Sequence, residues 1–416
     1  MDVYSSNAIV LTDFFSVQSS KPLPQDDSLK LLTLGVTKAI AVKSGISSEI
    51  EVHKIFKKVN SAFKLFGATS KTIKHRCMVF GPGDYSDILA AKLVENDHFV
   101  NFDLSFPLYD DLIHRHSNPD GADLNKRILM IYKKTIELVE SLYKGITIQP
   151  DDIIHVTSTG YIDPNPIDAL ANNRKWYDTI ISNCYHRGCN ASLQAIRMGH
   201  DFLKSSMYNK FEKNKSRIDI VHTEVNSAHM NICKYNPMNI IFLSEFSDGF
   251  IRYSLLPQSS IINNGPSGLK ILSLSQQLIP DTINCSKVST ASPSFLLEVD
   301  TLAYIYSIKK YFKKFVVNLC HKVGIDYDKE KGKLVFAIQP SGAEYINKIG
   351  KLLHLADEQL YFSKNVMYEY GDMTSAGLPY IYRDILASDD VPTGTKVLGL
   401  GYAQGIILGG IVFEKV

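Results

Sequence analysis

The sequence predicts an α/β fold. Strand-like runs of β-branched residues alternate with segments whose apolar residues recur at helical spacing, the pattern typical of α/β proteins. The 416 residues are enough for two domains, or for one large domain built from two halves. Two segments of the chain also share one strand–helix–strand–helix plan, which favours an arrangement in halves.

Helices are predicted where apolar residues follow a 3.6-residue period. In the segment over 123–143 the apolar positions leave a polar face that carries Lys133, Lys134 and Glu140. The predicted helices are Leu31–Ser44, Asp123–Tyr143, Pro166–Arg174, a helix that follows Cys189 through Leu203, and Ala343–Leu355.

Strands are predicted for short runs that are bounded by turn signals. They are Asp152–Thr159, Ile218–Glu224, Ile240–Phe246 and Lys333–Gln339. Asp248-Gly249 is predicted as a tight turn that leads into a further strand over 250–255. The turn-rich segments Ser259–Gly268 and Ser286–Ser294 are predicted as surface loops.

Two matching distances along the chain suggest duplicated halves. Cys189 follows 29 residues after Gly160, and Asp372 follows 30 residues after Gly342. In both segments a helical stretch fills the interval, and the polar residue stands where a new helix is predicted to begin. We therefore expect halves over residues 1–215 and 216–416 whose functional loops meet. An ordinary α/β protein also repeats strands and helices, so the spacing alone is consistent with both readings.

Composition and charge exclude several classes of function. The chain is 45% hydrophobic and 21% charged, with a formal net charge of +2, so it carries no global signature of binding to nucleic acid or to an anionic membrane. No apolar run approaches the length of a membrane span, and the N-terminus lacks the features of a secretory signal. The basic clusters over 54–58 and 309–314 are predicted as solvated helix faces.

The cysteines favour a reducing, cytoplasmic location. They show no CxxC or CxxH pair, so we expect neither a metal site nor a disulfide framework. The six are Cys77, Cys184, Cys189, Cys233, Cys285 and Cys320.

Cys189 is the candidate nucleophile. It lies in Arg187-Gly188-Cys189-Asn190-Ala191-Ser192, directly before the predicted helix. The unpaired N–H groups and the dipole at a helix N-terminus favour thiolate over thiol, and can lower a cysteine pKa from ~8.5 to roughly 3.5–7.5. We therefore expect a lowered pKa for Cys189. The alternative is that Cys189 is a small buried hydrophobic residue, as free cysteines usually are.

A series of short motifs points to a family. In chain order they are Val156-Thr157-Ser158-Thr159-Gly160, Tyr185-His186-Arg187-Gly188-Cys189, His222-Thr223-Glu224, Phe246-Ser247-Asp248-Gly249, Gln339-Pro340-Ser341-Gly342, Tyr370–Ala376 and Gly401-Tyr402-Ala403-Gln404-Gly405. This series resembles the thiolase superfamily, and most closely the type III polyketide synthases (chalcone-synthase-like) and the 3-ketoacyl-ACP synthases III. The resemblance spans roughly Leu31 to the C-terminus.

The resemblance implies a five-layered αβαβα fold built from two pseudo-symmetric βαβαβαββ halves, usually as a homodimer. It implies that Cys189 accepts an acyl group from CoA or from the phosphopantetheine of a carrier protein, with no other cofactor. The Cys189 backbone N–H and the loop from Gly401 to Gly405 would form the oxyanion hole.

The resemblance also assigns residues to the pocket and to the entrance. Phe246 matches an aromatic gatekeeper between the donor tunnel and the cavity, and Met230 stands at the second gatekeeper position, where the family has Phe. His229 and Thr159 would line the same pocket. Basic side chains near the donor entrance would meet its phosphates; the candidates are Lys71, Lys74 and Arg76, and the alternative for each is a solvated surface side chain.

Two departures from the family pattern concern catalysis. The catalytic His of the family is replaced by Gln339 and its Asn by Asp372, which gives Cys-Gln-Asp. Gln339 can donate through its amide but cannot exchange a proton near pH 7. An ionised Asp372 only accepts hydrogen bonds and would repel an enolate, so decarboxylation of malonyl units is expected to be disfavoured. With a pKa raised by burial, Asp372 would instead act as a base on an incoming nucleophile.

Two functions remain open from the sequence. The first is a Cys-acylating enzyme of polyketide, fatty-acid-like or other specialised-metabolite biosynthesis that transfers the acyl group to a carbon, oxygen or nitrogen acceptor. The second is a catalytically degenerate partner in a heteromeric synthase, in which case the chain would form a heterodimer. A neighbouring histidine would be a substitute for the missing one; the candidates are His155, His186, His222 and His229.

Overall fold

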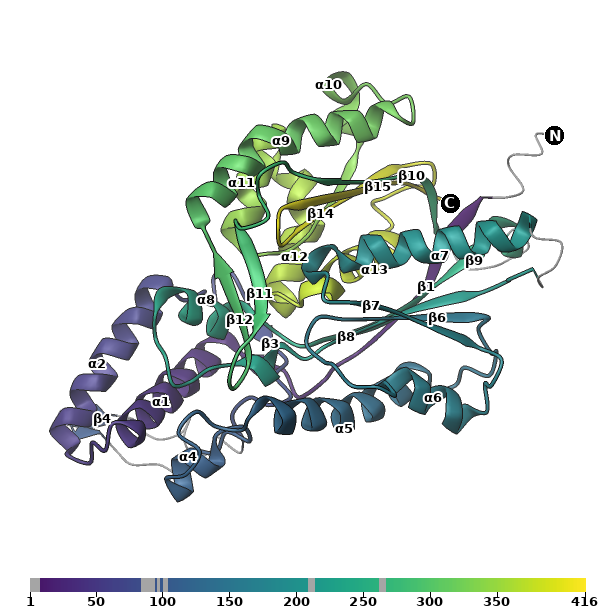
Figure 1. The fold of residues 1–416 in the computed structure, drawn as a ribbon. Coiled ribbons are helices and arrows are strands. Elements are labelled where there is room, and N and C mark those ends of the chain that lie inside the picture. The colour runs from purple at the N-terminus through teal and green to yellow at the C-terminus, as the bar shows by residue number, and fades with distance from the viewer. Residues whose placement is uncertain (1–7, 84–93, 96–97, 100–103, 209–213, 262–266) are drawn as a thin grey trace.

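The computed structural model describes residues 8–83, 94–95, 98–99, 104–208, 214–261 and 267–416. Its centre is a nine-stranded mixed sheet with the strand order β13-β14-β15-β10-β1-β9-β8-β6-β7 (Figure 1). The strands of this sheet are β1 (Ile9–Val17), β6 (Asp152–Thr157), β7 (Ile180–Tyr185), β8 (Ile218–Glu224), β9 (Gly249–Pro257), β10 (Leu269–Leu278), β13 (Val335–Ile338), β14 (Lys396–Ala403) and β15 (Ile407–Lys415).

Helices and three small strand pairs surround this sheet. The helices are α1 (Gln25–Lys43), α2 (Glu49–Phe66), α4 (Asp110–Arg115), α5 (Leu124–Leu142), α6 (Pro166–Arg174), α7 (Ala191–Tyr208), α8 (Pro237–Glu245), α9 (Thr301–His321), α10 (Tyr327–Glu330), α11 (Ala343–Leu353), α12 (Tyr361–Tyr370) and α13 (Gly377–Ala387). The short strands pair as β2 (Leu23–Pro24) with β3 (His75–Arg76), β4 (Val94–Glu95) with β5 (His98–Phe99), and β11 (Ser286–Thr290) with β12 (Phe295–Val299).

The sheet consists of two repeats. In the first, β6 and β8 are parallel, and β9 and β1 follow in antiparallel order. In the second, β13 and β14 are parallel, and β15 and β10 follow in antiparallel order. A short pairing of Val10 with Lys270 and of Leu11 with Leu269 joins β1 to β10. Strand pairing therefore divides the repeats between β9 and β10, whereas the predicted boundary at residue 215 falls before β8.

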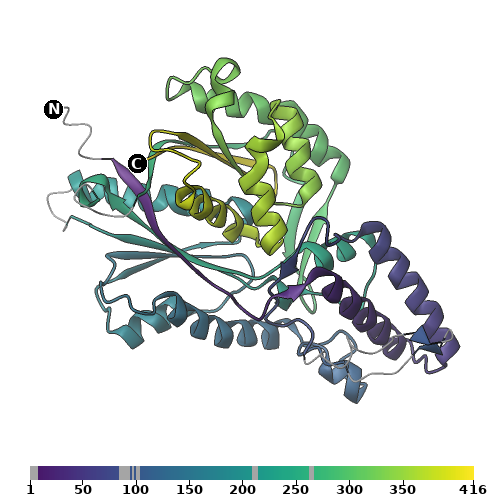
Figure 2. The same cartoon turned by 180° about the vertical axis from the view of Figure 1, so that it is seen from behind.

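Helices and half-sheets alternate in five layers (Figure 1). α5 and α6 cover the outer face of the first half-sheet, α7 and α13 lie between the two halves, and α9 and α11 cover the outer face of the second. The buried cluster in the middle layer contains Leu193 and Ile196 of α7 and Leu378 and Ile381 of α13. This arrangement confirms the predicted thiolase-like αβαβα fold. α1 and α2 form a helical pair beside the layers (Figure 2).

Most predicted elements are present, and several have the predicted bounds. α6 and β8 match the predictions residue for residue, and α5, α11 and β13 agree within a few residues. The basic clusters over 54–58 and 309–314 lie on α2 and α9, with most of their lysines exposed. Side-chain caps mark the starts of α5, α6 and α9, at Asp123, Asn165 and Asp300, and such local signals can be recognised from sequence.

The segment Ile240–Phe246 was predicted as a strand, and this prediction is wrong: it belongs to α8. The Asn236 side chain caps this helix by accepting from the Asn239 backbone N–H at 3.0 Å, and Pro237 occupies the first turn. These two start signals outweigh the β-branched composition of the segment. Consequently Asp248-Gly249 does not connect two strands of a hairpin.

The prediction of a loop over Ser286–Ser294 is also wrong in part. β11 occupies Ser286–Thr290 and pairs with β12 in an antiparallel hairpin. Part of the other predicted loop, residues 262–266 of Ser259–Gly268, lies outside the described residues. Among the described helices, none combines the length and the apolar character that crossing a membrane requires.

Candidate active site

The sequence motifs meet at the junction of the two half-sheets. Cys189 lies in the 3-10 turn η1 (Gly188–Asn190), directly before α7, and the turn η6 (Thr374–Ala376) directly precedes α13. η1 contacts η6, β14 and β15. Gly188 has φ 53°, and a Cβ there would lie 2.2 Å from the end of the Gln404 side chain, so a larger residue would strain this turn.

The environment of Cys189 differs from the predicted one. The residue is half-buried at the start of α7, as expected, but burial and the neighbouring Asp372 carboxyl raise the pKa of its thiol well above the ordinary value. The Ser341 hydroxyl opposes this shift. The prediction of a lowered pKa is therefore wrong, because loss of hydration and nearby acidic groups outweigh the helix N-terminus.

Asp372 is held in place through its backbone. Its N–H donates to the Glu245 carbonyl at 2.8 Å, and its carbonyl accepts from the Ser247 N–H at 2.8 Å. In the side chain, Oδ1 accepts from the Thr374 N–H at 2.8 Å. No hydrogen bond to Oδ2 is present among the described residues, so this oxygen is the one that remains for a substrate.

Burial sets the protonation state of Asp372. Removal from water, together with the nearby carboxyls of Glu245 and Glu224, raises its pKa to about 8. Burial likewise raises the pKa of Glu224 and of Glu245 to about 7 in each case. At pH 7 Asp372 is therefore mostly a neutral acid. Because Oδ1 accepts from Thr374, the acid proton belongs on Oδ2.

Gln339 lies beside this group, but its donors point at the backbone. Its side-chain Nε2 donates to the Thr374 carbonyl at 2.8 Å and more weakly to the Pro340 carbonyl at 3.4 Å. Its Oε1 is buried and has no hydrogen-bond partner among the described residues. Gln339 thus positions η6, and the donor that the sequence attributed to it is engaged there.

The loop from Gly401 to Gly405 connects β14 to β15, next to η1. Gly401 pairs with Gly409 in the antiparallel ladder, and a Cβ at Gly401 would lie 3.3 Å from Asn190. The Gly405 N–H donates to the Ser286 carbonyl at 2.9 Å. The loop therefore lies beside the Cys189 turn with the amide of Gly405 already bonded, and a role in an oxyanion hole stays a prediction.

The predicted pocket residues have different surroundings. Phe246 is half-buried and stacks on Phe242 with ring centroids 4.4 Å apart. Met230 belongs to the hydrophobic core, and its carbonyl accepts from the Tyr109 hydroxyl at 2.8 Å. A gatekeeping role for either residue remains a prediction.

His229 and Thr159 are in direct contact. His229 Nε2 donates to the Thr159 carbonyl at 2.6 Å, and its Nδ1 accepts from the Phe295 N–H at 3.3 Å. The rings of His229 and Phe295 stack with centroids 4.2 Å apart. Sequence reasoning missed Phe295 because it lies directly after a segment predicted as a loop. Its place after the turn-forming Pro293 was the one available signal.

The buried candidate histidines are engaged elsewhere. His155 contacts the Tyr185 hydroxyl at 2.7 Å and the Thr223 hydroxyl at 2.8 Å, and His222 contacts Ser375 at 3.0 Å and Tyr253 at 3.2 Å. Burial lowers the pKa of both rings to about 3, so they are neutral. Burial also lowers the pKa of His229 to about 4. His186 is exposed and lies edge-on to Phe295.

The predicted donor-binding residues divide into two kinds. Lys71 is exposed, and Lys74 is exposed and pairs with Glu369 at 3.1 Å. Arg76 is fully buried, and its guanidinium donates to Gln25 at 2.9 Å, to the Leu243 and Phe246 carbonyls at 2.7 and 2.9 Å, and to the Ser28 hydroxyl. The assignment of Arg76 to the donor phosphates is therefore wrong, because its donors are committed inside the protein.

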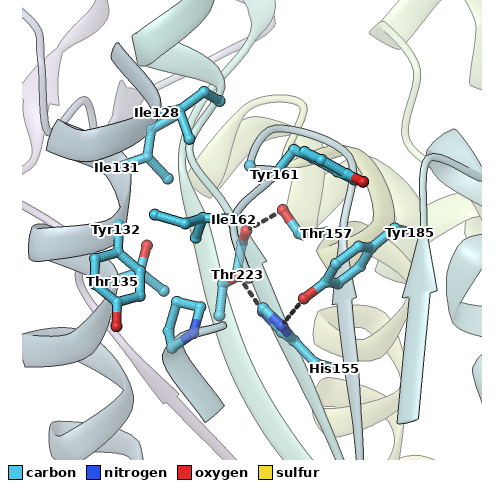
Figure 3. A pocket seen from close by; sticks show the side chains of 12 residues that line it. Ile128, Ile131, Tyr132, Thr135, His155, Thr157, Tyr161, Ile162, Tyr185 and Thr223 are labelled. Carbon is cyan, nitrogen blue, oxygen red and sulfur yellow. Dashed lines mark hydrogen bonds between the residues drawn. The ribbon is translucent and has the colours of Figure 1, made fainter. Parts of the chain in front are cut away.

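A small cavity lies between α5 and β6 (Figure 3). Its lining includes His155, Thr157, Tyr185 and Thr223, with Ile128 and Ile131 on the helix side. The cavity volume is about 20 Å³, enough for one water molecule and too small for an acyl chain. Elsewhere among the described residues, no group of three or more His, Cys, Asp or Glu side chains is arranged to hold a metal ion.

Comparison with known proteins agrees with this geometry. Residues 270–416 match the family of chalcone and stilbene synthases, C-terminal domain. Polyketide synthase 37 of Dictyostelium discoideum is 24% identical over 311 residues, which are 70% of this chain but 10% of that protein. The chain thus spans about a tenth of the length of this relative.

Solved structures determine the fold assignment. The C-terminal type III polyketide synthase domain of Steely1, from Dictyostelium, superimposes with a TM-score of 0.72 at 19% identity, over 99% of this chain and 100% of that one. PKS-I from the brown alga Ectocarpus siliculosus gives a TM-score of 0.76 at 15% identity, over 100% of both chains. The chain has the type III polyketide synthase fold.

The buried position of Arg76 leads to a prediction about stability. Arg76→Met leaves Gln25 and the Leu243 and Phe246 carbonyls without their donor. Each unpaired buried polar group costs about 1–3 kcal/mol, so the free energy of unfolding should fall by at least ~3 kcal/mol. Urea denaturation followed by circular dichroism measures this, with Lys71→Met as the exposed control. An Arg76→Met protein of wild-type stability would contradict the structural role.

Proposed function

We propose that this chain is a cysteine-dependent condensing enzyme of the polyketide type, which loads an acyl group from a thioester onto Cys189 and transfers it to a carbon nucleophile. One observation carries the proposal: the Cys189 turn and the Asp372 segment, far apart in sequence, meet at the junction of the two half-sheets. The matches to polyketide synthases support it.

In the loading step, Cys189 must lose its thiol proton. No histidine is among the groups that influence this thiol most, whereas the Asp372 carboxyl is close enough to raise its pKa. The ionised fraction of Asp372 takes the proton, and the thiolate forms a bond to the thioester carbonyl carbon. Collapse of the intermediate breaks the bond to the donor sulfur, and the proton passes from Asp372 to that leaving thiolate.

In the condensation step, Asp372 has the opposite role. The sequence predicted that malonyl decarboxylation is disfavoured, because an ionised Asp372 would repel the enolate. With a pKa of about 8, however, the Asp372 carboxyl is mostly neutral at pH 7. A neutral acid with its proton on Oδ2 donates a hydrogen bond to a developing enolate oxygen, as an amide would. Asp372 thereby supports both steps, each in a different protonation state.

The proposal also includes the acyl donor and a second copy of the chain as partners. The donor is an acyl-CoA or an acyl-carrier protein, and its phosphates would meet Lys71 and Lys74, the two exposed lysines near β3. A homodimer is supported by β7, which lies at the edge of the sheet, pairs with β6 alone among the described strands and exposes Ile180. A second copy would extend the sheet from this edge.

The first prediction of the proposed function concerns the acyl adduct on Cys189. Incubation with a panel of acyl-CoAs and acyl-carrier proteins should add one acyl mass, and peptide mapping should place it on Cys189. The rate of loading should rise as the pH increases through about 8, because only ionised Asp372 accepts the thiol proton. Cys184→Ala, which removes a buried cysteine nearby, is the control that should still load. Absence of an adduct with every donor would favour the degenerate-partner alternative.

The second prediction concerns donor binding. Lys71→Glu combined with Lys74→Glu should raise the donor KM and leave kcat nearly unchanged, because the change weakens attraction to phosphate without touching the reacting atoms. Lys57→Glu with Lys58→Glu, on the exposed face of α2, is the charge-matched control. An unchanged KM in the Lys71/Lys74 variant would remove this assignment.

The third prediction uses the proton on Asp372. Carbon dioxide release from malonyl-CoA by the wild type should fall as the pH rises through about 8, because an ionised carboxylate stops donating and opposes the enolate. At ~4 Å and an effective dielectric near ~20, this opposition is about 4 kcal/mol. In Asp372→Asn the release should lose this pH dependence, while loading of Cys189 slows because the base is absent.

Adding Gln339→His to Asp372→Asn should recover loading, since the imidazole can take the thiol proton. Asp384→Asn, on α13 and paired with Arg383, is the control acid and should behave as wild type. Release of carbon dioxide at a constant rate between pH 6 and 9.5 in the wild type would contradict the role of Asp372.

A further inference from the structure

The described site contains few free donors for the acyl oxygen. When a thiolate attacks a thioester, negative charge develops on the carbonyl oxygen, and loss of one donor for it typically costs about 10²–10³ in rate. Gln339 Nε2 donates to the Thr374 carbonyl, and the Gly405 N–H donates to the Ser286 carbonyl. Of the two groups that the family resemblance assigns to this oxygen, the Gly405 amide is thus already bonded, which leaves the Cys189 backbone N–H, and the neighbouring Gln339 amide is engaged as well.

A cluster of tyrosines from the second half of the chain lies on one side of Cys189. The tyrosine cluster consists of Tyr304 on α9, Tyr345 on α11 and Tyr402 on β14, with ring centroids 5.5 to 6.4 Å apart. Tyr402 is 4% exposed, and its hydroxyl makes no hydrogen bond of ordinary geometry with the described residues. Because an unpaired buried hydroxyl costs about 1–3 kcal/mol, a partner that arrives with the substrate would account for it.

Tyr402 lies close to the reacting groups. It is on β14, which contacts the Cys189 turn η1, and the Ser341 hydroxyl acts on both the Cys189 thiol and the Tyr402 phenol. The Asp372 carboxyl is also near enough to act on the phenol electrostatically. Burial raises the pKa of Tyr402 well above its ordinary value, so the phenol keeps its proton and remains a donor throughout the working pH range.

We propose that Tyr402 is a catalytic residue whose phenolic hydroxyl donates a hydrogen bond to the carbonyl oxygen of the acyl group as that group is transferred to Cys189. This inference rests on the proposed function. The phenol keeps its proton during the step: the carbonyl electron pair moves onto the oxygen when the sulfur–carbon bond forms, and returns when the bond to the donor sulfur breaks. Tyr402 stabilises the charge between these two events.

The test compares two Tyr→Phe variants, each of which removes a single hydroxyl group and leaves the ring in place. Tyr402→Phe removes the proposed donor, and Tyr382→Phe removes another buried, unpaired hydroxyl, on α13, where it packs against Gly399 and Phe413. The single-turnover rate of acyl loading, followed by intact mass, should fall about 10²-fold in Tyr402→Phe and remain at the wild-type value in Tyr382→Phe. Thermal unfolding confirms that both variants are folded.

A second measurement separates the acyl oxygen from the thiol. Alkylation of Cys189 by iodoacetamide forms no oxyanion, so its rate should be the same in Tyr402→Phe and in the wild type. Wild-type loading in Tyr402→Phe would overturn the proposal, and so would a parallel loss of alkylation, since the hydroxyl would then act on the thiol. A failure of the proposed function itself would give a third, different result. In that case the wild-type protein would form no acyl adduct, although iodoacetamide would still alkylate Cys189.

Discussion

The buried guanidinium of Arg76 is the interaction on which the geometry of the site depends. It donates to the Leu243 and Phe246 carbonyls and thereby fixes the C-terminal end of α8. That end in turn holds Asp372, through the Glu245 carbonyl and the Ser247 N–H. Gly371 packs so closely here that a Cβ would lie 2.8 Å from the Glu245 carbonyl oxygen and 3.2 Å from Arg76. A buried basic residue that belongs to the packing thus places the acid beside the nucleophile.

The second constraint is the burial of several carboxyls in one place. The pKa values of Asp372, Glu224 and Glu245 are all raised, and Arg76, a buried cation beside Glu245, is already committed to carbonyl oxygens. Burial, together with the nearby Asp372 and Glu224 carboxyls, raises the pKa of the Cys189 thiol as well. Proton occupancy, rather than a histidine, therefore determines which group donates and which accepts. This gives the proposed chemistry its dependence on pH near 8.

Close packing also decides which donors remain for a substrate. Gln339 and Gly405 use their N–H groups to hold η6 and the loop after β14. Tyr402 lies on the same strand as Gly401, but its hydroxyl makes no hydrogen bond of ordinary geometry within the described part of the chain. The groups that build the site and the groups that would act in it are thus different, although they come from the same short motifs.

The sequence by itself determined the fold class, most of the helices and strands, and the order of the motifs around Cys189, Gln339 and Asp372. These features depend on local periodicity, caps and turn residues, as in α6 with its Asn165 cap. It failed for Ile240–Phe246, where a cap and a proline outweighed composition. Tertiary structure alone decided the burial of Arg76, the raised pKa values of Cys189 and Asp372, and the engagement of the Gln339 amide. The physical reason is that hydration, charge proximity and hydrogen-bond partners arise from residues that are distant in sequence, 35 positions apart for Gln339 and Thr374 and 167 for Arg76 and Leu243, and no local pattern records them.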